Sequence, residues 1–114
     1  MKLPWLALGM ISALTLGMAS VQAADFGADR HVARGMNCET CHGKDNAIEY
    51  PTIEQCTGCH NPDAVEKATE GKYSQNPHRS PHYGNTMDCV LCHVQHGETQ
   101  DACGSCHTFG YKVP

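Results

Sequence analysis

The chain has 114 residues, the length of about one domain, and a formal net charge of −4 with its histidines counted as neutral. From residue 24 to the end it contains eight Cys and eight His but only ten Leu, Ile, Val and Phe residues, which excludes a conventional packed aliphatic core. The acidic balance, without a basic patch, argues against nucleic acid as a partner.

Residues 1–23 have the pattern of a secretory signal peptide. A short start with a single Lys precedes an apolar run over residues 3–18, and Val21 and Ala23 place small side chains at positions −3 and −1 of a cleavage site before Ala24. The alternative is a membrane anchor, but this run is shorter than the ~20 residues that span a bilayer. We therefore predict two parts, a cleaved signal peptide 1–23 and an exported, periplasmic domain 24–114 of net charge −5.

One motif, C-x-x-C-H, recurs four times in the exported part and uses every cysteine of the chain. The cysteines are Cys38 and Cys41, Cys56 and Cys59, Cys89 and Cys92, and Cys103 and Cys106, and the histidines that follow them are His42, His60, His93 and His107. The segments between the motifs are unequal in length and rich in Gly, Pro, Asn and Asp, which is typical of turns and loops.

Only one segment has a helical pattern of useful length. Residues 63–72 follow Pro62 and contain Gly71 near their end, so we predict a helix over Asp63–Lys72. No alternating pattern indicates a strand. The predicted fold is mostly irregular with short α-helices.

Three interpretations compete for the cysteines. An exported chain with an even number of cysteines is by default a disulfide scaffold, and pairs of C-x-x-C units can also build four-thiolate zinc sites. Neither needs a histidine after every second cysteine, whereas covalent c-type haem does. Two thiols at this spacing reach the two vinyl groups of one haem, and the next residue places its imidazole under the iron. The sequence therefore predicts four haem c groups, whose plates supply the apolar core of a compact multihaem cytochrome.

The remaining histidines complete the ligand count for four six-coordinate irons. They are the predicted distal ligands His31, His78, His82 and His96. His31, His82 and His96 each precede a motif histidine by 11 residues, so we pair them with His42, His93 and His107, which leaves His78 for His60. Met36 and Met87 are the rival ligands, and we interpret them as packing residues.

The four motifs, with one His before the first and two between the second and third, resemble those of the small tetrahaem cytochromes c and the cytochrome domain of flavocytochrome c fumarate reductases. The run His93-Val94-Gln95-His96 is similar to a proximal–distal pair of that family, in which one His serves the third haem and the next serves the fourth. One departure is that three residues separate His78 and His82 here, where the family has two. We expect no flavin domain in this chain, because its sequence has neither a G-x-G-x-x-G unit nor the length for one.

Two histidines on every iron predict an electron carrier rather than an enzyme. They favour a low reduction potential and leave no open coordination position for a substrate. We predict a monomeric periplasmic shuttle of anaerobic respiration, passing electrons from a quinol-oxidising membrane cytochrome to terminal reductases. The alternative is a dedicated cytochrome subunit of a separate flavin-containing, fumarate-reductase-like enzyme.

Overall fold

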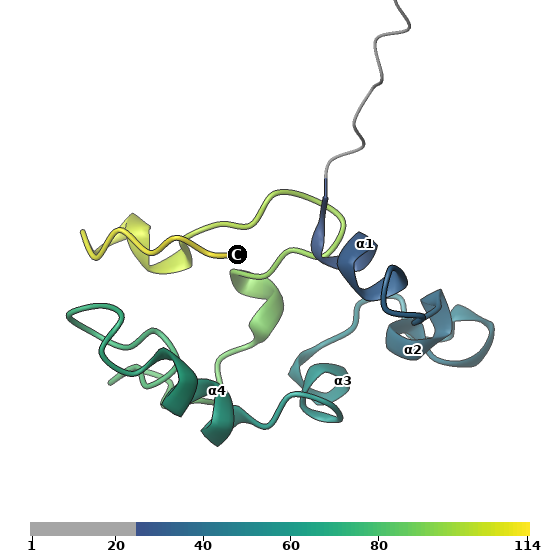
Figure 1. Cartoon of the computed structure of the whole chain (residues 1–114), viewed down its shortest axis with the longest axis horizontal. Coiled ribbons are helices and arrows are strands. Elements are labelled where there is room, and N and C mark those ends of the chain that lie inside the picture. The colour runs from purple at the N-terminus through teal and green to yellow at the C-terminus, as the bar shows by residue number, and fades with distance from the viewer. Residues whose placement is uncertain (1–24) are drawn as a thin grey trace, which may run out of the picture.

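The computed structural model describes residues 25–114, so the predicted signal peptide and its cleavage site lie outside the described residues. The described part contains seven short helices (Figure 1): α1 (Gly27–Val32), α2 (Cys38–His42), the 3-10 helix η1 (Lys44–Asn46), α3 (Ile53–Thr57), α4 (Pro62–Thr69), and the 3-10 helices η2 (Cys89–Leu91) and η3 (Ala102–Ser105). Between residues 25 and 114 no strand forms beyond one isolated bridge that joins Ser80 and Gly84. The prediction of an irregular chain with short helices is confirmed.

Helix α4 is the helix that the sequence predicted, with shifted bounds. The Asn61 side chain accepts a hydrogen bond from the Ala64 N–H (3.0 Å) and Pro62 occupies the first turn, so the start is well specified. The predicted end at Lys72 is wrong. Glu70 already has an extended ψ of 135°, and Gly71 has a φ of +73°, a conformation that glycine adopts without steric cost.

Each C-x-x-C-H motif forms a helical turn, which the sequence analysis did not predict. In the second, third and fourth motifs the histidine N–H donates to the carbonyl of the first cysteine, at 2.8 to 2.9 Å. Side chains just ahead of the turns accept from their free N–H groups: Asn37 before α2, Asp88 before η2 and Asp101 before η3. An Asn or Asp one or two residues before a motif cysteine was the signal that could have revealed these turns.

Segments far apart in the sequence are joined by a few hydrogen bonds. The Ala28 N–H donates to the Gln95 carbonyl (2.8 Å), which places α1 beside the segment that follows η2. At the opposite end of the molecule the Tyr111 hydroxyl donates to the Gln75 carbonyl (2.9 Å). Figure 1 shows η2 in the middle, with α1 and α2 at one end and the yellow C-terminal segment reaching the other. The third motif is therefore central.

No apolar side chain is buried within residues 25–114. Val32, Tyr50, Tyr83 and Leu91 are large and exposed, and the one buried polar residue is Asn76, 9% exposed. None of the helices in this part is long and apolar enough to cross a membrane. Residues 25–114 thus have no aliphatic core of their own, as their composition predicted.

Candidate functional site

The eight histidines form four pairs, and in every pair the ring centroids lie 6.0 to 6.2 Å apart. The pairs are His31 with His60, His42 with His96, His78 with His93, and His82 with His107. Each pair joins one motif histidine to one histidine outside the motifs. The set of eight candidate ligands that the sequence singled out is therefore brought together two by two.

The predicted partners within this set are wrong. The 11-residue offset paired His31 with His42, but His31 faces His60, and His42 instead faces His96. The offset also paired His82 with His93 and His96 with His107, and it left His78 for His60. The structure opposes His82 to His107 and His78 to His93. Two rings can face each other only when their segments approach from opposite sides, and that approach depends on tertiary contacts, not on sequence spacing.

The corrected pairs change which motifs share a connecting segment. His93 and His96 are three residues apart. His93 is part of the third motif, whereas His96 faces His42 of the first motif and not His107 of the fourth. His78 and His82 connect the third and fourth motifs, not the second and third. The third motif takes part in both connections.

Hydrogen bonds at the Nδ1 atoms orient several of the rings. The Nδ1 of His31 lies 2.7 Å from the Gly27 carbonyl, and that of His42 lies 2.7 Å from the Ile48 carbonyl. The Nδ1 of His78 is 3.0 Å from the Thr69 hydroxyl. When Nδ1 donates its proton to such an acceptor, Nε2 keeps its lone pair free to bind a metal.

Burial favours the neutral form of two of these imidazoles. Desolvation lowers the pKa of His78 and of His93 below that of free histidine. For His93 the neighbouring His78 acts in the same direction, and a hydrogen bond to the backbone of Pro114 opposes it. A neutral imidazole is the form that coordinates metal.

The four pairs differ in the angle between their ring planes. The rings of His31 and His60 are almost perpendicular, at 84°, whereas those of His78 and His93 are nearly parallel, at 15°. The other two pairs, His42–His96 and His82–His107, have intermediate angles of 27° and 37°.

Cysteine thiols of neighbouring motifs lie near one another and affect one another's pKa values. Burial, and after it the nearby Cys89, Asp88 and Cys41 side chains, together raise the pKa of the Cys56 thiol to about 11. Burial likewise raises the pKa of Cys103, with Cys92 close by. The second motif therefore lies beside the third, and the third lies beside the fourth.

The donor set fits haem better than the alternative groups. All eight thiols are free, and residues 25–114 contain no group of three or more His, Cys, Asp or Glu side chains placed to hold a metal ion together, as a zinc site requires. Paired imidazoles about 6 Å apart leave room for one metal ion between them, because each metal–nitrogen bond is about 2 Å and the ring radii account for the rest. Plates between the rings would also supply the missing apolar core.

Comparison with known proteins agrees with this chemistry. Residues 30–108 match the family described as Cytochrome c3. The chain belongs to the cytochrome c3 family. Over 97% of its length it is also 33% identical to the acrylate reductase cytochrome subunit of Shewanella woodyi, of which the match covers 96%. No solved structure matches the chain.

Membership of the cytochrome c3 family confirms several of the predictions. The chain is a multihaem c-type cytochrome with covalently bound haem, and it carries electrons without being catalytic itself. The irregular fold with few short helices is that of a small multihaem cytochrome. The disulfide and zinc interpretations of the cysteines are thereby replaced.

Proposed function

We propose that the chain binds four haem c groups and is the periplasmic cytochrome subunit that supplies electrons to a separate reductase of an unsaturated carboxylic acid such as acrylate. The observation that carries this proposal is the set of four histidine pairs, one for each C-x-x-C-H motif, with ring separations of 6.0 to 6.2 Å. The likeness to an acrylate reductase cytochrome subunit over almost the full length of both chains supports the choice of acceptor.

In this proposal each motif holds one haem through two thioethers and one imidazole. The residues that would hold the irons are His42 and His96 for the first haem, His60 and His31 for the second, His93 and His78 for the third, and His107 and His82 for the fourth. The haem iron supplies a one-electron couple. Two imidazoles on each iron would leave no coordination position for a substrate, so the acid would be reduced on the partner protein.

The placement of the thiols supports a short route for electrons. Helix α3 of the second motif packs against η2 of the third, and Cys92 of the third is near enough to Cys103 of the fourth to raise its pKa. Cys41 of the first motif likewise raises the pKa of Cys56. We therefore propose that electrons pass from motif to motif, with the third motif in the middle.

The predicted signal peptide 1–23 supports export, and a quinol-oxidising membrane cytochrome is the donor that we propose.

The second candidate function is a free shuttle that passes electrons to several reductases. The net charge of −5 on residues 24–114 favours it, because a charged surface supports brief, salt-sensitive encounters with more than one partner.

Co-purification from native periplasm under mild conditions tests the proposal. We expect a flavin-containing reductase in stoichiometric amount with the cytochrome, and intact-mass analysis of the cytochrome should show a chain that starts at Ala24 with four covalent haems. The reduced cytochrome should be reoxidised by acrylate only when that partner is present. An unaccompanied cytochrome that reduces several unrelated reductases equally well would favour the shuttle.

A further inference from the structure

Asn76 is the one buried polar residue of the described chain, and both its amide nitrogen and its amide oxygen are hydrogen-bonded. Its Nδ2 donates to the Glu66 carbonyl in α4 (2.8 Å). Its Oδ1 accepts from the backbone N–H of His78 (3.0 Å) and lies 3.0 Å from the Thr69 hydroxyl. Because a buried amide that loses its partners is costly, this arrangement is well determined. Asn76 thus ties the end of α4 to the segment that carries His78.

Thr69 is the last residue of α4, and its hydroxyl lies between Asn76 and the His78 ring. The oxygen is 3.0 Å from the Nδ1 of His78. It is also 2.9 Å from the Val65 carbonyl and 3.1 Å from the Glu66 carbonyl of its own helix. When Nε2 of His78 binds a metal, Nδ1 carries the ring proton and donates it to the hydroxyl. The hydroxyl proton then points to the amide oxygen of Asn76 or to a helix carbonyl.

This support differs from that of His31 and His42, whose Nδ1 atoms are also hydrogen-bonded. His31 and His42 each have a backbone carbonyl at 2.7 Å, which no side-chain substitution removes. His78 has a side-chain hydroxyl at a longer distance of 3.0 Å. An acceptor on Nδ1–H strengthens the imidazole as a metal donor and stabilises the oxidised metal. At His78 this acceptor is a side-chain hydroxyl, so a single substitution of Thr69 can remove it.

We propose that Thr69 and Asn76 are positioning residues that fix the tautomer and the donor strength of His78, and that they thereby set the reduction potential of the third haem. This inference rests on the proposed axial pairing of His78 with His93. Thr69 acts directly on the ring, whereas Asn76 holds the backbone of His78 and orients the hydroxyl.

The decisive variant is Thr69→Val, which removes the hydroxyl and keeps the shape of the side chain. Redox titration of each haem, followed through its assigned haem-methyl NMR signals, should show the third haem shifted by about tenfold in its equilibrium toward the reduced form, which is 59 mV for a one-electron couple. Thr69→Ser keeps the hydroxyl and should restore the potential. Asn76→Ala should shift the potential less and lower the unfolding temperature more.

The matched control is Thr86→Val. The Thr86 hydroxyl also donates to a backbone carbonyl, that of Tyr83 (2.8 Å), and it makes no hydrogen bond to an imidazole. Its loss should leave the third haem unchanged. If Thr69→Val gives the same potentials as Thr86→Val, while all four haems remain bound and low-spin, the positioning role is wrong and the proposed function stands. If intact mass shows fewer than four haems in the wild type, the proposed function itself fails.

A measurement on the wild type keeps the inference testable if the Thr69 variants do not mature. The fully reduced protein is diamagnetic, and its NMR spectrum should contain a slowly exchanging His78 Nδ1 proton with a nuclear Overhauser contact to the Thr69 methyl group. A proton that exchanges as fast as those of exposed imidazoles would overturn the proposal.

Discussion

The His31–His60 pair and the His78–His93 pair have the same ring separation, 6.2 Å, but differ in orientation and support. The first pair is nearly perpendicular, at 84°, and a backbone carbonyl inside α1 orients His31. The second is nearly parallel, at 15°, and a side-chain network at the end of α4 orients His78. The comparison shows that two pairs with the same ring separation can differ in ring angle, and that the acceptor at Nδ1 orients His31 and His78 in different ways.

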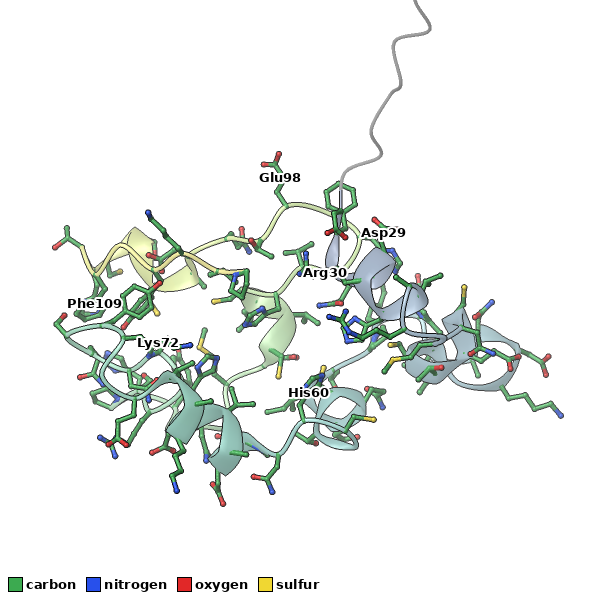
Figure 2. The ribbon with its side chains drawn as sticks, in the orientation of Figure 1. Asp29, Arg30, His60, Lys72, Glu98 and Phe109 are labelled. Atoms are coloured by element: carbon green, nitrogen blue, oxygen red, sulfur yellow. The ribbon has the colours of Figure 1, made fainter. Side chains whose placement is uncertain are left out.

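The two regions also differ in their place in the molecule. The third motif, which contributes His93, adjoins thiols of the second and fourth motifs, whereas His31 belongs to α1 near one end (Figure 1). Figure 2 shows His60 well away from Phe109, whose ring stacks on that of His107 in the fourth motif. We therefore expect the two sites to respond unequally to the same change.

The largest expected difference concerns stability. Replacing Cys89 and Cys92 by Ala should cost more than replacing Cys56 and Cys59, because the third motif is central and no aliphatic core compensates for a lost haem. Each loss should be at least of the size of a removed disulfide in a small exported domain, about 2–5 kcal/mol. Thermal unfolding of the two purified double variants, followed by circular dichroism, measures the difference, and equal losses would contradict the central role of the third motif.

Removal of single distal ligands should have the next largest effect. His31→Ala should make the second haem high-spin and open to carbon monoxide, and His78→Ala should do the same to the third haem. Each site should rise in potential, because an imidazole donor is lost. Assigned NMR spectra of the carbon monoxide adducts identify the affected haem. The 11-residue offset would instead place these effects at the first and second haems, so the result decides between the two pairings.

The ring angles predict a spectroscopic contrast in the unmodified oxidised protein. Perpendicular axial imidazoles leave two iron d orbitals nearly equal in energy, whereas parallel ones separate them. Electron paramagnetic resonance should therefore show one highly anisotropic low-spin signal, from the second haem, beside rhombic signals from the other haems. The anisotropic signal should disappear in His31→Ala and persist in His78→Ala. Its persistence in both variants would show that it arises elsewhere.

The sequence predicted the chemistry of the site better than its geometry. The C-x-x-C-H motif requires a cysteine pair and an imidazole in fixed local order, so their types could be read from neighbouring residues. The partner of each imidazole depends on contacts such as that between Ala28 and Gln95, which no local pattern encodes. His31 and His42 belong to successive helices, and yet they face His60 and His96.

The fold was predictable to a similar extent. The shortage of aliphatic residues excluded an ordinary core, and the start of α4 was indicated by Asn61 and Pro62. The helical turns of the motifs were not predicted, because turns of three to five residues have no hydrophobic period. The buried position of Asn76 was not predictable either, since it depends on Glu66, Thr69 and His78 meeting in space.

The smallest expected effect separates the two sites by charge. Lys72 lies close enough to His78 to lower the pKa of that imidazole, after the larger effect of burial. A nearby positive charge also favours the reduced metal. Lys72→Gln should therefore lower the reduction potential of the third haem. The change in the free energy of reduction should be about 0.2–1 kcal/mol, the usual effect of an exposed charge, and the potential of the second haem should not change. Per-haem titration at low and high salt checks this, since salt should abolish a shift of electrostatic origin.

The absence of buried apolar side chains in the described domain also bears on how the protein is made. A chain that needs its prosthetic groups for a core cannot fold before they are attached, so haem attachment precedes folding. Any molecule that misses an attachment stays unfolded and open to proteases. We expect the mature population to be uniformly loaded with haem, because folding itself selects the completed chains.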